Sequence, residues 1–251
     1  NIVLLGATGS IGDSCLNVIR QNKKHFHLFG IGLGGNLDKA QQITKEFNPK
    51  HIFIAEPHID KSHDLLHSYP NILSTEDELQ GLIQDPSVDI VISAISGFAG
   101  LKASFFAIDA GKTILIANKE SIVAAGDILM PLAQAKKSEI IPVDSEHNAI
   151  HQCFPPHSDM KEISKIIITA SGGPFREKTF KELSEVTLQD ALKHPTWSMG
   201  TKITIDSATL VNKCLELIEA HYLFQIPESQ IEIVVHPQSI IHSMVTYIDG
   251  S

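Results

Sequence analysis

Short apolar runs alternate with amphipathic segments through the first part of the chain. Ile2–Leu5 is apolar throughout, and a helical pattern follows it through Ile19. Further strand-like runs recur with helical segments such as Leu37–Phe47 between them: Leu28–Gly32, His51–Ala55, Asp89–Ser93, Thr113–Ala117 and Glu139–Val143. Strands separated by helices predict a parallel, doubly wound α/β sheet. The short apolar runs IVIS and TILIA fit strands that are buried on both faces.

The second part of the chain mixes the two patterns less regularly. Ile166–Thr169 and Ile240–Ile248 have strand-like composition, and a helical pattern runs up to Phe224. We therefore expect two domains: a Rossmann-like domain over residues 1–146, and an α+β domain over residues 147–251 that binds substrate and metal.

A glycine-rich segment separates the first apolar run from the first helical pattern. It reads Gly6-Ala-Thr8-Gly9-Ser10-Ile11-Gly12. Glycines in a strand–turn–helix context let the main chain approach a pyrophosphate, and the helix start supplies N–H donors. This segment predicts a dinucleotide site.

The choice between NAD and NADP is expected at the end of the second strand. An acidic residue there would bind the ribose 2′-hydroxyl of NAD. The chain has Gly34-Gly35-Asn36, with no carboxylate until Asp38. This favours NADP, and Lys39 is a candidate contact for its 2′-phosphate.

Two polar segments follow later strands of the predicted sheet. Asn118-Lys119-Glu120-Ser121 follows TILIA, and Asp144-Ser145-Glu146 follows IIPV. Both lie at the carboxyl edge, where such sheets bind ligands. Helix capping by Asn118, Asp144 or Ser145 is the simpler explanation. The alternative for the second segment is a site for Mg²⁺ or Mn²⁺, since two neighbouring carboxylates repel unless a cation or solvent lies between them.

Anion-binding groups recur further along the chain. Ser171-Gly172-Gly173 is either a plain turn or a loop whose amides face an anion. The stretch from His194 to Phe224 predicts a helix that has Ser207 at its start and then Asn212, Lys213 and Glu216 on one surface. The helix start favours a phosphate, and Glu216 offers a third carboxylate. An amphipathic helix with a solvated polar face is the alternative.

His194–Thr201 has neither helical nor strand periodicity. Its aromatic residue, Trp197, and the terminal Gly200 are typical of a lid loop that excludes water. Packing of Trp197 in a core and a histidine without a chemical role are the simpler alternatives. His147, His236 and His242 are further polar candidates.

Composition narrows the classes of partner. The chain has 251 residues, 43% hydrophobic and 20% charged, and a formal net charge of −9. An acidic chain argues against nucleic acid, and no apolar run is long enough to predict a membrane span. The cysteines form no CxxC pair, which favours a reduced, cytoplasmic setting.

Taken together, GATGSIG, NKES, VDSEHNAI, ASGGPFR and the His194–Phe224 stretch resemble the 1-deoxy-D-xylulose 5-phosphate reductoisomerase family. The resemblance runs from Gly6 to Met244. It implies a homodimeric enzyme of the non-mevalonate isoprenoid pathway that uses NADPH and Mg²⁺ or Mn²⁺ to form 2-C-methyl-D-erythritol 4-phosphate. It also implies a further C-terminal helical domain, so we expect this chain to be a fragment.

The resemblance assigns roles residue by residue. Asp144, Glu146 and Glu216 match the metal ligands, and Asn118, Lys119 and Glu120 match residues that line the nicotinamide region. The matching substrate contacts are Ser145, Glu146, Ser171, His194, Ser207, Asn212, Lys213 and Glu216. From this set and the lid we expect Lys119, Glu146, His194 and Trp197 to be catalytic. Gly35 departs from the family, which often has a basic residue there.

Two alternatives to this activity stay open. A semialdehyde dehydrogenase also begins with a GATG-like turn, but it needs a nucleophilic cysteine, for which Cys153 is the candidate. The second alternative is that this chain is only a cofactor-binding module and catalyses no turnover.

Overall fold

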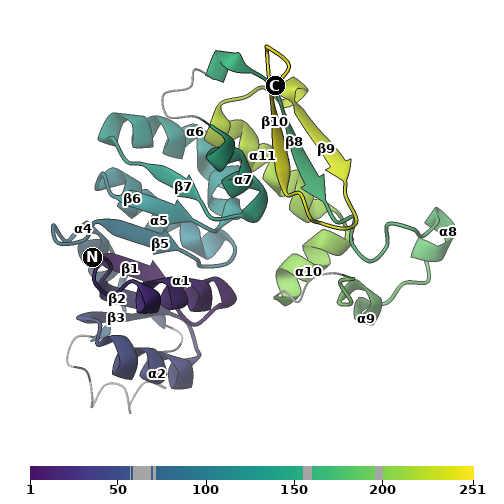
Figure 1. Ribbon diagram of the computed structural model, residues 1–251. Coiled ribbons are helices and arrows are strands. Elements are labelled where there is room, and N and C mark those ends of the chain that lie inside the picture. The colour runs from purple at the N-terminus through teal and green to yellow at the C-terminus, as the bar shows by residue number, and fades with distance from the viewer. Residues whose placement is uncertain (57, 59–68, 70–71, 155–159, 196–199) are drawn as a thin grey trace. The chain divides into compact units, whose positions relative to one another are not determined.

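The computed structural model describes the chain apart from residues 57, 59–68, 70–71, 155–159 and 196–199 (Figure 1). The chain divides into two compact units, Asn1–Val143 and Asp144–Ser251. The predicted boundary lies three residues later, after Glu146. Asp144 and Glu146 therefore belong to the second unit.

The first unit is built around a seven-stranded sheet in which neighbouring strands are all parallel. Its strands are β1 (Ile2–Leu5), β2 (Leu28–Leu33), β3 (His51–Ile54), β4 (Ile72–Leu73), β5 (Ile90–Ser93), β6 (Thr113–Ile116) and β7 (Ile140–Pro142). The helices between them are α1 (Ser10–Gln21), α2 (Leu37–Phe47), α4 (Glu76–Gln84), α5 (Leu101–Asp109) and α6 (Lys119–Lys136). The predicted doubly wound α/β fold is confirmed.

The strand order is β4-β3-β2-β1-β5-β6-β7. The chain moves outward from β1 on one side, then crosses to β5 on the other. The carboxyl ends of β1 and β5 thus flank the point where the order reverses, which is where such sheets bind ligands. β1 and β2 are buried along their whole length, as strands covered on both faces must be.

The second unit combines a three-stranded sheet with helices. Its sheet order is β10-β8-β9, with β10 antiparallel and β9 parallel to β8. Its elements are α7 (Ser145–Cys153), β8 (Ile163–Ala170), α8 (Phe180–Leu183), α9 (Leu188–Ala191), α10 (Thr201–Ala208), α11 (Val211–Phe224), β9 (Ile231–Val235) and β10 (Ser243–Tyr247). Ile150, Ile166, Ile168, Ala220 and Phe224 form its buried core.

The helix predicted up to Phe224 is broken in two, which corrects its expected geometry. α10 ends at Ala208, and Leu210 adopts a left-handed conformation with φ of 61° before α11 begins at Val211. Ser207 therefore lies in the last turn of α10 and not at a helix start. No glycine or proline marks this break, so sequence pattern did not reveal it.

The described residues contain no helix that is both long enough and apolar enough to cross a bilayer.

Candidate active site

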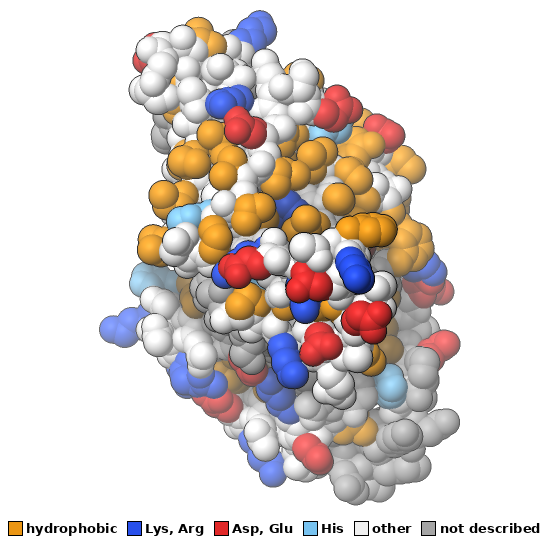
Figure 2. All heavy atoms as spheres, turned by 90° about the vertical axis from the view of Figure 1, so that its right-hand side faces the viewer, with side chains coloured by type: hydrophobic (Ala, Val, Ile, Leu, Met, Phe, Trp, Pro, Cys, Tyr) orange, Lys and Arg blue, Asp and Glu red, His pale blue; other side chains and the backbone are white. Residues whose placement is uncertain are grey.

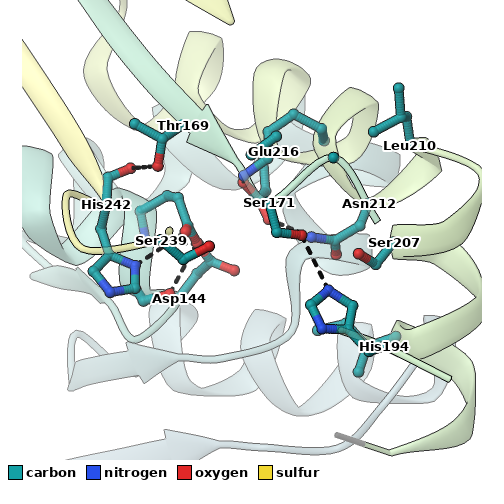
Figure 3. A pocket seen from close by; sticks show the side chains of 16 residues that line it. Asp144, Thr169, Ser171, His194, Ser207, Leu210, Asn212, Glu216, Ser239 and His242 are labelled. Carbon is teal, nitrogen blue, oxygen red and sulfur yellow. Dashed lines mark hydrogen bonds and ion pairs between the residues drawn. The ribbon is translucent and has the colours of Figure 1, made fainter. Parts of the chain in front are cut away.

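A cavity of about 360 Å³ opens within the second unit (Figure 3). Its walls come from the start of α7, the end of β8, α10, α11 and the segment before β10. The lining residues are Asp144, Ser145, Glu146, Thr169, Ala170, Ser171, Gly172, His194, Ile203, Ser207, Leu210, Asn212, Lys213, Glu216, Ser239 and His242. Every residue that the resemblance assigned to metal or substrate is among them.

Three carboxylates meet in this cavity. One oxygen from each of Asp144, Glu146 and Glu216 lies within 4.8 Å of the others. Asp144 caps α7 by accepting a hydrogen bond from the Glu146 N–H at 3.1 Å, so the capping interpretation also holds. Carboxylates this close repel one another unless a cation lies between them. An all-oxygen donor set suits Mg²⁺ or Mn²⁺, so the residues fit such an ion.

Polar groups on α11 surround the carboxylate of Glu216. Its Oε1 accepts a hydrogen bond from Asn212 Nδ2 at 2.5 Å, and its Oε2 forms an ion pair with Lys213 Nζ. Glu216 is only 1% exposed and Lys213 7%. The predicted i,i+4 and i,i+3 neighbours are thus in contact. Across the cavity, His242 Nδ1 lies 3.1 Å from Glu146 Oε1.

The Gly172-Gly173 turn brings Ser171 to His194. Ser171 Oγ lies 3.0 Å from His194 Nε2 and accepts the Gly173 N–H at 3.3 Å (Figure 3). Gly173 has φ of +68°, and a Cβ there would lie 2.6 Å from the Ser207 carbonyl oxygen. Burial, followed by the nearby charge of Arg176, lowers the pKa of His194. A largely neutral imidazole therefore faces the Ser171 hydroxyl at neutral pH.

His147 lies behind the acidic cluster and does not line the cavity. Its side chain is fully buried, with Nδ1 2.9 Å from Glu219 Oε2 and Nε2 2.9 Å from the Glu216 carbonyl oxygen. Burial lowers the pKa of His147, but the carboxylate of Glu219, followed by Asp144 and Glu216, outweighs burial and raises it to about 9. His147 thus carries positive charge at neutral pH. Sequence reasoning singled out His147 but missed Glu219.

The first unit has a second cavity, of about 600 Å³, at the strand-order reversal. Its lining residues are Gly6, Thr8, Gly9, Gly32, Leu33, Gly34, Phe53, Ala55, Glu56, Ser74, Glu76, Leu79, Ala94, Ile95, Ser96, Ala99 and Lys102. Of the predicted cofactor contacts, Gly6, Thr8, Gly9 and Gly34 lie here. Several lining residues that were not predicted follow directly after the carboxyl ends of β3 and β5. Their position after a predicted strand could have identified them from the sequence.

Seven predicted cofactor contacts do not line this cavity, four of them near the start of the chain. Ser10 and Ile11 begin α1, and Gly35 precedes Asn36, which caps α2 by accepting the Lys39 N–H at 3.2 Å. Lys39 Nζ contacts Asp13 Oδ2 at 2.6 Å and the Thr8 carbonyl oxygen at 3.0 Å. The lysine proposed for the 2′-phosphate is therefore already engaged by a carboxylate.

Asn118 acts as a helix cap. Its side chain is 2% exposed, accepts the Ser121 N–H at 2.8 Å and donates to the Gly97 carbonyl at 2.5 Å. Lys119 is buried and Glu120 half-buried. None of Asn118, Lys119 and Glu120 lines either cavity. Their assigned place beside the nicotinamide stays a prediction. Trp197 lies outside the described residues.

Comparisons with known proteins identify the family of the chain. Residues 2–126 match the family model described as 1-deoxy-D-xylulose 5-phosphate reductoisomerase, and residues 140–224 match the model of that enzyme's C-terminal domain. The reductoisomerase of Francisella tularensis subsp. novicida is 49% identical over the whole chain, and that of Acinetobacter baylyi is 46% identical. The chain spans 65% and 66% of the lengths of these two relatives.

Solved structures give the same result. A crystal structure of DOX-P reductoisomerase in complex with NADPH, fosmidomycin and magnesium covers the whole chain with a TM-score of 0.93 and 42% identity. The Zymomonas mobilis enzyme in complex with NADPH has a TM-score of 0.90 and 44% identity. The chain covers 64% and 65% of these two structures. Similarity of this extent in both sequence and fold places the chain in the 1-deoxy-D-xylulose 5-phosphate reductoisomerase family.

Proposed function

We propose that the protein converts 1-deoxy-D-xylulose 5-phosphate to 2-C-methyl-D-erythritol 4-phosphate, with NADPH and Mg²⁺ or Mn²⁺. The observation that carries this proposal is the cavity of the second unit, where three carboxylates adjoin hydroxyl, amide and ammonium groups. The relatives named above carry this activity in their names, and solved relatives hold NADPH and magnesium.

Asp144, Glu146 and Glu216 would hold the divalent cation. A bound cation polarises a substrate carbonyl and stabilises the oxyanion that forms, while NADPH supplies the hydride. Lys213 supplies positive charge beside Glu216, and His242 contacts Glu146, so the site combines acidic ligands with cationic or polar groups. The substrate is an anion, and an acidic chain must meet it with such local groups.

The substrate phosphate would lie among Ser171, Ser207 and Asn212. Each offers a neutral donor to the cavity, and the nearby start of α11 offers main-chain N–H groups. His194 would orient the Ser171 hydroxyl through their 3.0 Å contact. This replaces the expected phosphate site at a helix beginning with Ser207.

The cofactor would bind in the cavity of the first unit. Gly6 has φ of +84°, and a Cβ there would lie 2.3 Å from the Ala94 carbonyl oxygen. Glycine therefore lets the turn after β1 pack against the end of β5, and the adjoining start of α1 provides N–H donors for a pyrophosphate. Lys119 and Trp197 keep their proposed catalytic roles.

The proposal is tested by following NADPH oxidation with 1-deoxy-D-xylulose 5-phosphate, first with Mg²⁺ or Mn²⁺ and then with a chelator. Turnover that chelation abolishes and that fosmidomycin inhibits supports it. Absence of turnover under conditions in which a full-length relative is active, while NADPH still binds, contradicts it.

The semialdehyde dehydrogenase alternative is not favoured. Cys153 stands at the end of α7 and lines neither cavity. Alkylation of the thiols is therefore expected to leave turnover unchanged.

We also infer that the protein acts as a cytoplasmic homodimer. Hydrophobic side chains gather in the upper part of Figure 2. In the second unit the edge strand β9 exposes Ile233, Val234 and Val235, and the segment before β10 exposes Ile240 and Ile241. An exposed hydrophobic edge strand favours pairing with another strand. Sedimentation analysis should give a dimer, and Val234→Lys should shift it toward monomer. An unaltered chain that sediments as a monomer contradicts this inference. The cytoplasmic setting is supported by three free cysteines.

A further inference from the structure

A buried ion pair stands directly behind the three carboxylates. His147 on α7 is 0% exposed and Glu219 on α11 is 1% exposed. The two are joined by the 2.9 Å contact between Nδ1 and Oε2. Neither residue lines the cavity, so neither can touch a substrate there.

The second ring nitrogen of His147 contacts the main chain that carries a proposed metal ligand. Nε2 lies 2.9 Å from the carbonyl oxygen of Glu216. A carbonyl oxygen only accepts, so Nε2 must carry a hydrogen. With Nε2 so fixed, Nδ1 is left to face Glu219, and the two contacts together set the orientation of the ring.

This pair touches every segment that supplies a carboxylate. His147 directly follows Glu146 on α7, and its Nδ1 lies 3.8 Å from Asp144 Oδ1. Its other contacts are with Glu216 and, one turn later, Glu219. Phe224 packs edge-on against the ring, with centroids 6.2 Å apart. The ring therefore joins the two helices at the level of the acidic cluster.

We propose that Glu219 is a positioning residue of the metal site: by holding His147 between α7 and α11, it keeps Glu216 in register with Asp144 and Glu146. This inference rests on the proposed function, because the metal site is part of it.

The physical reason is that a buried imidazole keeps its orientation less firmly when one of its nitrogens has no polar partner. Removal of Glu219 leaves Nδ1 buried without its partner, and the ring then reorients or draws in water. Either change releases the contact with the Glu216 carbonyl. Outer contacts of this kind typically change metal affinity by about 10- to 100-fold when lost.

The test is a titration of the full chain with Mn²⁺, followed by the loss of the free-ion signal in electron paramagnetic resonance. This readout needs neither NADPH nor substrate. Glu219→Ala should raise the Kd for Mn²⁺ by about 10-fold or more. Glu219→Gln retains a side chain of the same length that can donate to Nδ1, so it should restore the Kd to within about threefold of the unaltered chain.

A matched control separates positioning from general loss of stability. Ile163→Ala removes buried carbon atoms from the same core, at the start of β8 and outside α7 and α11, so it should destabilise the unit but leave the Kd for Mn²⁺ unchanged. If Glu219→Ala does not fold, Glu219→Asp replaces it. That variant keeps the charge but withdraws it from Nδ1 by one methylene, and a similar weakening is expected.

Each outcome decides the matter. A folded Glu219→Ala or Glu219→Asp variant that binds Mn²⁺ within twofold of the unaltered chain overturns the inference, as does an equal loss in Ile163→Ala. Failure of Glu219→Gln to restore binding also overturns it. An unaltered chain that binds no Mn²⁺ refutes the metal site itself, and with it the proposed function.

Discussion

The two cavities of this chain are lined by different kinds of group, main chain in one and charged side chains in the other. In the first unit, Gly6, Gly9 and Gly34 bring main chain to the cavity surface. In the second unit, side chains such as Glu216 and Lys213 determine the character of the cavity. The first site thus depends on the absence of side chains, and the second on the charge of those present. Substitutions should therefore act by steric exclusion in one site and by electrostatics in the other.

The largest effect is expected from removing charge in the second cavity. Glu216→Gln keeps the size of the side chain but takes away a carboxylate that would bind the cation. Turnover should fall by at least about 100-fold. Loss of a group that only contacts a metal ligand already lowers metal affinity or activity by about 10- to 100-fold. Steady-state kinetics across a Mg²⁺ series measures this, and NADPH affinity should not change. Unchanged turnover would remove Glu216 from the metal site.

The ion pair between His147 and Glu219 should also make the stability of the protein depend on pH. The pKa of His147 is raised from 6.5 to about 9. A raised folded-state pKa gives stability that is complete below pH 6.5 and is lost as pH rises through 9. The free energy of unfolding should therefore fall by up to about 3 kcal/mol over this window. Urea unfolding across the pH range measures it, and Glu219→Gln should flatten the profile. A profile that Glu219→Gln leaves unaltered contradicts the assignment to this pair.

Steric exclusion in the first cavity can be tested with a pair of glycines. Gly6→Ala meets the Ala94 carbonyl at 2.3 Å in a left-handed conformation, so it should cost about 1–3 kcal/mol and weaken NADPH binding. Gly81→Ala in α4 meets nothing within 4 Å and should stabilise by about 0.5–1 kcal/mol. Urea unfolding and NADPH titration of both variants check this. Equal effects would mean that the close approach at Gly6 is unimportant.

The smallest effect is expected from removing a charge near the first cavity. Lys39 is held by Asp13 and the Thr8 carbonyl. Lys39→Met should change the ratio of NADPH to NADH affinity by less than about threefold, because an exposed ion pair is worth about 1 kcal/mol or less. Fluorescence titration with both nucleotides measures the ratio. A larger fall in NADPH affinity alone would restore Lys39 as the 2′-phosphate contact.

The first unit was predictable because its signals are local. Buried strands such as Ile2–Leu5 lack polar positions, and the helix Leu37–Phe47 was predicted with the bounds observed. The two-residue strand Ile72–Leu73 carries too few residues to show a period. For Asn118 the structure favours the capping interpretation, because a cap and a ligand share the same residue types.

The second unit was predictable in its residues but less so in its geometry. Asp144, Glu146 and Glu216 meet as expected, although Glu216 is far away in sequence. The helix break at Leu210 was missed because a left-handed leucine is imposed by tertiary packing and has no sequence signal. Glu219 was missed because a lone helical glutamate is typical of solvent-exposed positions, and only the structure shows it buried against His147.

The most direct test of the difference between the two sites is a joint titration of the unaltered chain and of a variant with Asp144→Asn, Glu146→Gln and Glu216→Gln combined. The unaltered chain should bind Mn²⁺ and NADPH. The variant should lose Mn²⁺ binding and keep its affinity for NADPH, because the carboxylates make one site and the main chain makes the other. Undiminished Mn²⁺ binding by the variant would contradict the account.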